Sequence, residues 1–276
     1  MLGLLIKMEC PSKNIIFNMK PKVPKKPVST VHQQRLPLFC KKTKFETIFG
    51  NIELSKELSQ THKDILDAMA TCSIKKGKTL EGRMFIVFDI REVLKFLGHK
   101  KITHHKWLSQ KLDDMMSTII KLQYTKNDRI YKIHSNIINK FGYSEKFKKE
   151  NIKEGTFGEG CYYVVVFSEE FTKLYEHDTV IYLDKQTIKA IVDVSSDFVK
   201  SVIRFCMSHQ QCNMKLEDIM YYLGYENISE RHKQRLKAEI LKYKNYLEEN
   251  FNIIVKQEKN QITIFYKSNL SVFLPE

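Results

Sequence analysis

The stretch from residue 215 to residue 266 constrains the fold more than any other part of the chain. Its first apolar residues have the i, i+3, i+4, i+7 spacing of one helical face: Leu216, Ile219, Met220 and Leu223. Gly224 follows, where a left-handed helix cap favours glycine. A longer helix is expected from Ser229, and its core side consists of Leu236, Ile240, Tyr243 and Leu247. Residues 253–257 and 261–266 alternate as strands do, so the sequence predicts two helices followed by a hairpin.

Helix, turn, basic helix and hairpin is the element order of a winged helix-turn-helix, which places its second helix in the DNA major groove. The side of that helix opposite its apolar stripe carries Arg and Gln, which suit base edges, and Lys, which suits phosphate. A small Ala there permits close approach to the groove. The alternative is an ordinary solvated basic face. The residues predicted to bind DNA are Arg231, Lys233, Gln234, Arg235, Ala238, Lys242 and Lys259.

An earlier part of the chain repeats this pattern. The first stripe and its glycine recur at one constant offset as Ile90, Val93, Leu94, Leu97 and Gly98. The second stripe recurs at a nearly equal offset as Leu108, Leu112, Met115 and Ile119. Residues 121–124 and 129–133 then stand where the hairpin strands would be. The sequence therefore predicts an α+β fold of two winged-helix domains in tandem, at residues 41–153 and 160–270.

The two copies differ on the face that would meet DNA. Asp113 and Asp114 lie opposite Leu108 and Leu112 in the first copy. Carboxylates are unfavourable close to DNA phosphates. The first domain is therefore expected to read bases poorly and to make DNA-backbone or protein contacts instead.

The N-terminal segment, residues 1–40, is rich in proline and lysine and is expected to be a disordered basic tail. The formal net charge of +14 indicates an anionic partner, most commonly nucleic acid. No apolar run approaches the roughly 18 residues of a membrane-spanning helix. The six cysteines include no C-x-x-C pair, which argues against a zinc site and a disulfide framework. We therefore expect a cytoplasmic protein without a metal or a membrane partner.

Two motifs could suggest an enzyme, and neither is complete. The segment from Cys72 to Thr79 ends like a phosphate-binding loop, but Cys72 replaces its first glycine and a predicted helix precedes it. His104 and His105 are adjacent, whereas metal-dependent nickases have an alternating His-x-His. The sequence thus predicts neither catalysis nor a cofactor.

Residues 45–268, and most of all residues 196–266, resemble iteron-binding plasmid replication initiators of the RepA/TrfA type. The resemblance is carried by the segment from Lys215 to Gly224 and by the basic helix with its hairpin. It implies that the C-terminal winged helix reads repeated origin sequences in double-stranded DNA. It also implies that the N-terminal one supports a homodimer in equilibrium with monomer and a secondary DNA contact. Initiators of this type recruit the host initiator and helicase, and their dimers repress their own gene.

A short segment of the tail is similar to the peptide by which bacterial replication proteins dock on the sliding clamp. In that mode an extended peptide places an apolar pair in a pocket while a glutamine holds the rim. The corresponding residues are Gln34, Leu36, Leu38 and Phe39. The alternative is an apolar lead-in that packs on the first domain.

Together these features predict a non-enzymatic, sequence-specific DNA-binding initiator of plasmid replication. One alternative is a winged-helix transcriptional repressor without replication activity. Another is a structural or partner-binding protein whose basic faces never meet DNA. Tandem repeats of about two DNA turns upstream of the gene would favour the first of the three.

Overall fold

The computed structural model describes residues 39–47, 50–99, 104–126, 129–144, 162–176, 183–209, 211–259 and 261–267, and the statements below concern these residues. The helices are α1 (Gln60–Thr71), α2 (Ile90–Phe96), α3 (His105–Ser117), α4 (Glu169–Glu176), α5 (Lys185–Asp193), α6 (Asp197–Met207), α7 (Leu216–Tyr222), α8 (Glu230–Lys242) and α9 (Lys244–Phe251). The strands are β1 (Lys44–Thr47), β2 (Gly50–Leu54), β3 (Ser73–Lys78), β4 (Met84–Asp89), β5 (Ile119–Lys126), β6 (Arg129–Asn136), β7 (Ile138–Ser144), β8 (Tyr162–Phe167), β9 (Gln211–Lys215), β10 (Ile253–Glu258) and β11 (Gln261–Lys267).

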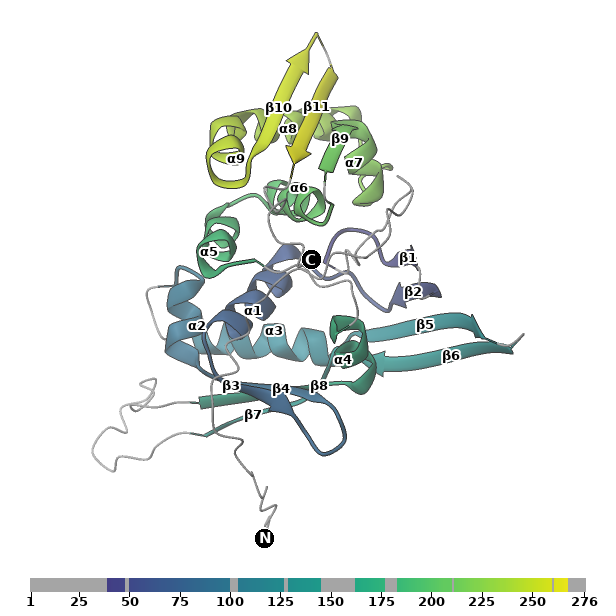
Figure 1. Cartoon of the computed structure of the whole chain (residues 1–276), viewed down its shortest axis with the longest axis vertical. Helices are drawn as coiled ribbons and strands as arrows, with labels where there is room; N and C mark the ends of the chain where they lie inside the picture. The colour runs from purple at the N-terminus through teal and green to yellow at the C-terminus, as the bar shows by residue number, and fades with distance from the viewer. Residues whose placement is uncertain are drawn as a thin grey trace, which may run out of the picture.

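The described strands form three small antiparallel sheets, in the orders β1-β2-β5-β6, β3-β4-β8-β7 and β10-β11-β9. Figure 1 shows the first two sheets around α1, α2 and α3, and the third at the opposite end of the molecule with α6 to α9. We call β1 to α4 the N-terminal unit and α6 to β11 the C-terminal unit. The arrangement is of the α+β type, as the sequence indicated. Among the described residues, no helix is long and apolar enough to cross a membrane.

The C-terminal unit follows the predicted order of elements closely. Strand β9 leads directly into α7, and α8 begins after the N-cap Ser229, whose Oγ accepts a hydrogen bond from the backbone N–H of His232 at 3.3 Å. Leu236 and Ile240 are buried and hold α8 to the core. The predicted long helix is interrupted at Tyr243, which caps both α8 and α9. The interruption lets α9 pack along β10 with Leu247 and Phe251 buried.

The helix pair of the N-terminal unit repeats that of the C-terminal unit. Helices α2 and α7 are both 7 residues long, and α3 and α8 are both 13. Gly98 and Gly224 each follow the first helix with a φ of +82°, a conformation that suits glycine. The residue after each glycine donates its backbone N–H to a carbonyl of the helix, His99 to Leu94 at 2.9 Å and Tyr225 to Met220 at 2.8 Å. The repeat in the sequence therefore corresponds to a repeat of helix geometry.

The sheets do not repeat in the same way. In the C-terminal unit, β9 precedes the helix pair and pairs directly with the hairpin strand β11. In the N-terminal unit, β4 precedes the helix pair but pairs with β3 and β8, while the hairpin β5–β6 joins β2. This hairpin is also longer than the sequence indicated, at residues 119–126 and 129–136. The similarity between the two units is thus limited to their helices.

Strand β8 lies in the N-terminal unit, although the predicted boundary at residue 160 placed it in the second domain. It pairs with β4 on one side and β7 on the other. Tyr163, Val165 and Phe167 are buried. The sheet of the N-terminal unit thus provides this apolar strand with partners on both edges.

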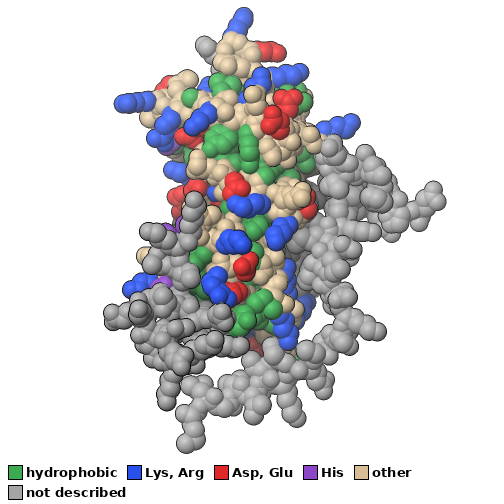
Figure 2. All heavy atoms as spheres, turned by 90° about the vertical axis from the view of Figure 1, so that its left-hand side faces the viewer, with side chains coloured by type: hydrophobic (Ala, Val, Ile, Leu, Met, Phe, Trp, Pro, Cys, Tyr) green, Lys and Arg blue, Asp and Glu red, His purple; other side chains and the backbone are tan. Residues whose placement is uncertain are grey.

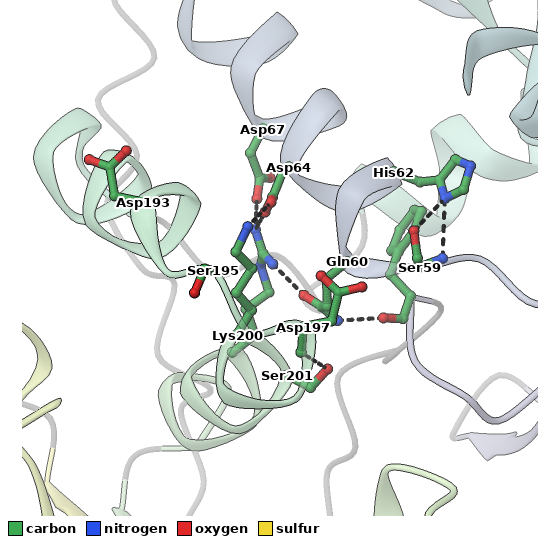
Figure 3. Close-up of polar contacts among 12 residues, drawn as sticks. Ser59, Gln60, His62, Asp64, Asp67, Asp193, Ser195, Asp197, Lys200 and Ser201 are labelled. Atoms are coloured by element: carbon green, nitrogen blue, oxygen red, sulfur yellow. Dashed lines mark hydrogen bonds and ion pairs between the residues drawn. The ribbon is translucent and has the colours of Figure 1, made fainter. Parts of the chain in front are cut away.

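A buried network of charged side chains joins the two units, as Figure 3 shows. Asp64 of α1 pairs with Lys200 of α6 and accepts a hydrogen bond from Nη2 of Arg204 at 2.6 Å. Nη2 of Arg204 also lies 2.9 Å from Asp67. Burial raises the pKa of Asp67, but Lys63 and Arg204 lower it more, so that the pKa lies below its usual value. The network fixes α1 against α6.

Candidate nucleic-acid interface

Helix α8 exposes the face that the sequence assigned to DNA. The side chains of Arg231, Gln234, Arg235, Ala238 and Lys242 are all exposed, opposite the buried Leu236 and Ile240. The apolar stripe fixes the rotation of the helix about its axis, so the other residues must face solvent. The structure thus brings five of the seven predicted residues together on one surface.

The polar contacts of this face lie within α8. Gln234 donates to a carboxylate oxygen of Glu230 at 2.9 Å, and Nη2 of Arg235 lies 3.0 Å from Nε2 of His232. Nε of Arg235 lies 3.9 Å from Glu239. Exposed contacts of this kind contribute little to stability and exchange readily for other partners. The face can therefore rearrange to bind a ligand without loss of the fold.

The other two predicted residues lie apart from this face. Lys233 is half-buried and lies 3.9 Å from Glu230. Lys259 is exposed in the turn between β10 and β11, with a φ of +53°. On the side of α8 toward α7, Lys237 forms an ion pair with Glu217 at 2.7 Å. Lys237 is only 16% exposed, so this pair attaches α8 to α7 and leaves the basic face to other residues.

A cavity of about 400 Å³ lies along one edge of the exposed face. From α8 it is lined by His232, Arg235, Glu239 and Lys242, and from the start of α6 by Ser196 and Asp197. Lys41, which precedes the first strand, also lines it. Burial raises the pKa of Asp197, and the nearby Asp64 raises it further, against the effects of Lys200 and Arg204. Three cationic side chains therefore meet two carboxylates at this edge.

The fold is similar to that of domains 2 and 3 of RctB. The crystal structure of the selenomethionine derivative of these domains matches with a TM-score of 0.53 and 13% identity, and covers 80% of this chain and 86% of that one. The crystal structure of RctB residues 155–483 matches with a TM-score of 0.54 and 12% identity, covering 84% and 92%. No protein-family model and no curated protein matches the sequence.

At this level of identity the likeness to RctB concerns the fold alone. It extends over both units, because the matched share of the chain exceeds either unit by itself. It says nothing about which side chains of α8 contact a ligand.

On α3, Asp114 lies among basic side chains. Asp114 lies 3.4 Å from Lys56, 3.3 Å from Lys111 and 3.4 Å from His62. Burial lowers the pKa of His62, although Asp114 raises it. Asp113 remains exposed. The carboxylate of Asp114 is thus partly neutralised, while that of Asp113 still faces solvent as the sequence indicated.

Figure 2 shows the side of the molecule that is on the left in Figure 1. Lys and Arg side chains are scattered over this face, with acidic side chains between them. This face therefore carries no continuous basic surface within the described residues. On this face the basic side chains are interspersed with acidic ones.

The remaining predicted residues concern the sliding clamp. Gln34, Leu36 and Leu38 lie outside the described residues. Phe39 is 7% exposed, packs in the hydrophobic core, and accepts a hydrogen bond at its carbonyl from the side chain of Gln60. This matches the alternative of an apolar lead-in that packs on the protein. Phe39 would have to leave the core to fill a pocket elsewhere.

The described residues hold no cluster of three or more His, Cys, Asp or Glu side chains that could bind a metal. The four described cysteines, Cys40, Cys72, Cys206 and Cys212, carry free thiols. Cys206 is buried on α6, where its spacing from Val202 suits a core position.

Proposed function

We propose that the protein is a DNA replication initiator that binds double-stranded DNA through α8. The observation that carries the proposal is the exposed row of Arg231, Gln234, Arg235 and Lys242 on a helix fixed by Leu236 and Ile240. Arginine and glutamine can each make two hydrogen bonds to a purine edge in the major groove, and lysine binds phosphate. The initiator role itself comes from the resemblance of residues 45–268 to plasmid replication initiators, and the similarity to RctB domains 2 and 3 concerns the fold.

The order of elements in the C-terminal unit supports a winged helix. Helix α6, strand β9, helices α7, α8 and α9, and the hairpin β10–β11 follow one another, and β9, β10 and β11 form one three-stranded sheet. In this arrangement α8 is the recognition helix and the hairpin is the wing, with Lys259 at its tip near the DNA backbone. The N-terminal unit is then a second, modified winged helix with its own sheet pairing.

The finer parts of the proposal follow the resemblance to plasmid initiators. The protein binds repeated origin sequences in the cytoplasm, without catalysis, metal or cofactor. It exchanges between monomer and homodimer, and the N-terminal unit provides the dimer contact and a secondary DNA contact. The host initiator and helicase are the proposed protein partners.

Substitutions on α8 test this proposal directly. Selection from random duplexes with the purified protein should yield a preferred site. Arg231→Ala or Gln234→Ala should then weaken binding to that site by about 1–3 kcal/mol and relax base choice at one position, because a base-edge contact is lost. Lys242→Ala should weaken binding to all duplexes alike and reduce the slope of log affinity against log salt by about one unit. Affinities for the selected and an unrelated duplex, titrated at several salt concentrations, measure both effects.

The comparison between these variants decides which helix reads DNA. If Arg231, Gln234 and Arg235 can all be replaced without loss of discrimination, α8 is not the recognition helix. Equal losses for Arg231→Ala and Lys242→Ala on every sequence would instead identify a helix that binds only the DNA backbone.

Replication distinguishes an initiator from a transcriptional repressor. A circular DNA that carries the selected site in tandem copies should replicate when the protein is supplied from a second molecule. The Arg231→Ala protein should support less replication, in proportion to its weaker binding. Binding to the same sites without any replication would favour the repressor.

A further inference from the structure

Residues 39–42 lie far from α8 in the sequence but pack beside it in the structure. We call this segment the strap. The strap precedes β1, yet the backbone nitrogen of Lys42 lies only 2.8 Å from the position that a Cβ on Gly224 would occupy. Nζ of Lys41 lies 5.5 Å from the centre of the Tyr225 ring. The strap therefore crosses the turn between α7 and α8, and Gly224 permits this close approach.

The backbone of the strap is held in place by buried side chains and by hydrogen bonds. Phe39 and Cys40 are buried, at 7% and 5% exposure. The side chain of Gln60 donates to the carbonyl of Phe39 and also accepts from Arg204, so the strap is attached to the junction of α1 and α6. Burial raises the pKa of Cys40 to about 11, which keeps its thiol neutral. The backbone that carries Lys41 is consequently fixed, while the Lys41 side chain is exposed.

The position of Lys41 relative to α8 is the important feature. Lys41 lines the same cavity as Arg235 and Lys242, at the edge of the exposed face of the helix. Asp197 and Glu239 also line this cavity, and their charges oppose an anion. Ser196 donates to Glu239 at 2.6 Å, and Arg235 lies 3.9 Å from the same carboxylate. With Glu239 engaged on both sides, the three cations outweigh the two carboxylates.

We propose that Lys41 is part of the DNA interface and contacts a backbone phosphate beside the groove that α8 enters. The proposal rests on the function proposed above. A helix in the major groove has the phosphates of both strands along its edges, and a cation beside one edge is placed to meet them. Because neighbouring buried residues fix its backbone, Lys41 loses less conformational freedom on binding than a lysine in a free chain would. A segment ahead of the N-terminal unit thus completes the binding surface of the C-terminal unit.

The experiment compares Lys41→Ala and Lys41→Arg with wild type in the full chain. The matched control is Lys140→Ala, which removes an exposed lysine from β7 in the sheet at the far end of the N-terminal unit. Each protein is titrated with the selected duplex and with an unrelated duplex at several salt concentrations. Unfolding of each variant in urea is recorded alongside, to verify that loss of this exposed side chain leaves the fold intact.

Lys41→Ala should weaken binding to both duplexes by the same factor and reduce the salt slope by about one unit. Lys41→Arg should retain the slope, and Lys140→Ala should match wild type. A Lys41→Ala protein with wild-type affinity and slope overturns the inference while leaving α8 as the reader. A loss confined to the selected duplex also overturns it, because that result identifies a base contact. If wild type binds no duplex at all, the inference fails together with the proposed function.

Discussion

Asp64→Ala should lower the free energy of unfolding by about 3–5 kcal/mol, because it leaves two buried cations without their shared carboxylate. The side chains of Asp64, Lys200 and Arg204 are only 6%, 9% and 13% exposed. Water cannot replace the missing partner at such positions, and Asp67 reaches only Arg204 among the two cations. Urea unfolding of the variant, with the midpoint and slope compared to wild type, measures the loss.

The matched control is Asp193→Ala on α5. Asp193 also pairs with a lysine, Lys189, but the two side chains are 50% and 38% exposed. Such a surface pair contributes at most about 0.5 kcal/mol within a helix. Both variants remove an aspartate that pairs with a lysine, but Asp64 also pairs with Arg204, so the contrast is between a buried network and an exposed pair. Equal small losses for the two variants would show that α1 and α6 do not depend on the network.

Features that depend on local sequence could be predicted well. The stripe of Leu216, Ile219 and Met220 and the glycine at position 224 define α7 within a few residues, because helix periodicity and capping are local properties. The same holds for α2 and Gly98. The exposed face of α8 followed from the same reasoning, since burial of Leu236 and Ile240 decides which side chains face solvent.

Features that depend on distant partners could not be predicted. The apolar run of β8 indicates a buried strand, but nothing in that run says that its neighbours are β4 and β7. The end of α8 at Tyr243 is another case, because the apolar stripe continues through it to Leu247. The Tyr243 hydroxyl lies 2.8 Å from Oγ of Ser195, a contact with a residue far away in the chain.

The candidate site shows the same division. The sequence identified the residues of α8 but missed Lys41 and His232 at the edge cavity. Lys41 stands among the lysines near the tail and has no distinguishing pattern of its own. Two features of the sequence bear on the position of Lys41. The apolar residues Phe39 and Cys40 before it are buried, and Gly224 allows the backbone of the strap to approach closely. Only the fold brings these residues together.

Ile240→Ala should lower the free energy of unfolding by about 2–5 kcal/mol, through lost apolar burial and the cavity left behind. Ile240 is fully buried where α8 meets the core of the C-terminal unit. The matched control is Ile254→Ala on β10, the same substitution at a side chain that is 40% exposed, which should cost far less. Urea unfolding of the two variants measures the difference, and equal losses would show that Ile240 does not hold α8 in place.

DNA binding by the Ile240→Ala variant tests whether Ile240 only holds α8 in place or also affects how the helix recognises bases. Ile240 points away from the exposed face, so replacing it leaves Arg231 and Gln234 on the surface. At a temperature where Ile240→Ala remains folded, its ratio of specific to non-specific affinity should equal that of wild type, because any unfolded fraction reduces both affinities by the same factor. Arg231→Ala should show the reverse, with nearly unchanged stability and a reduced ratio. The contrary result would be a folded Ile240→Ala protein that no longer discriminates between specific and non-specific DNA. That result would show that the packing beneath α8 also sets the angle at which the helix meets the bases.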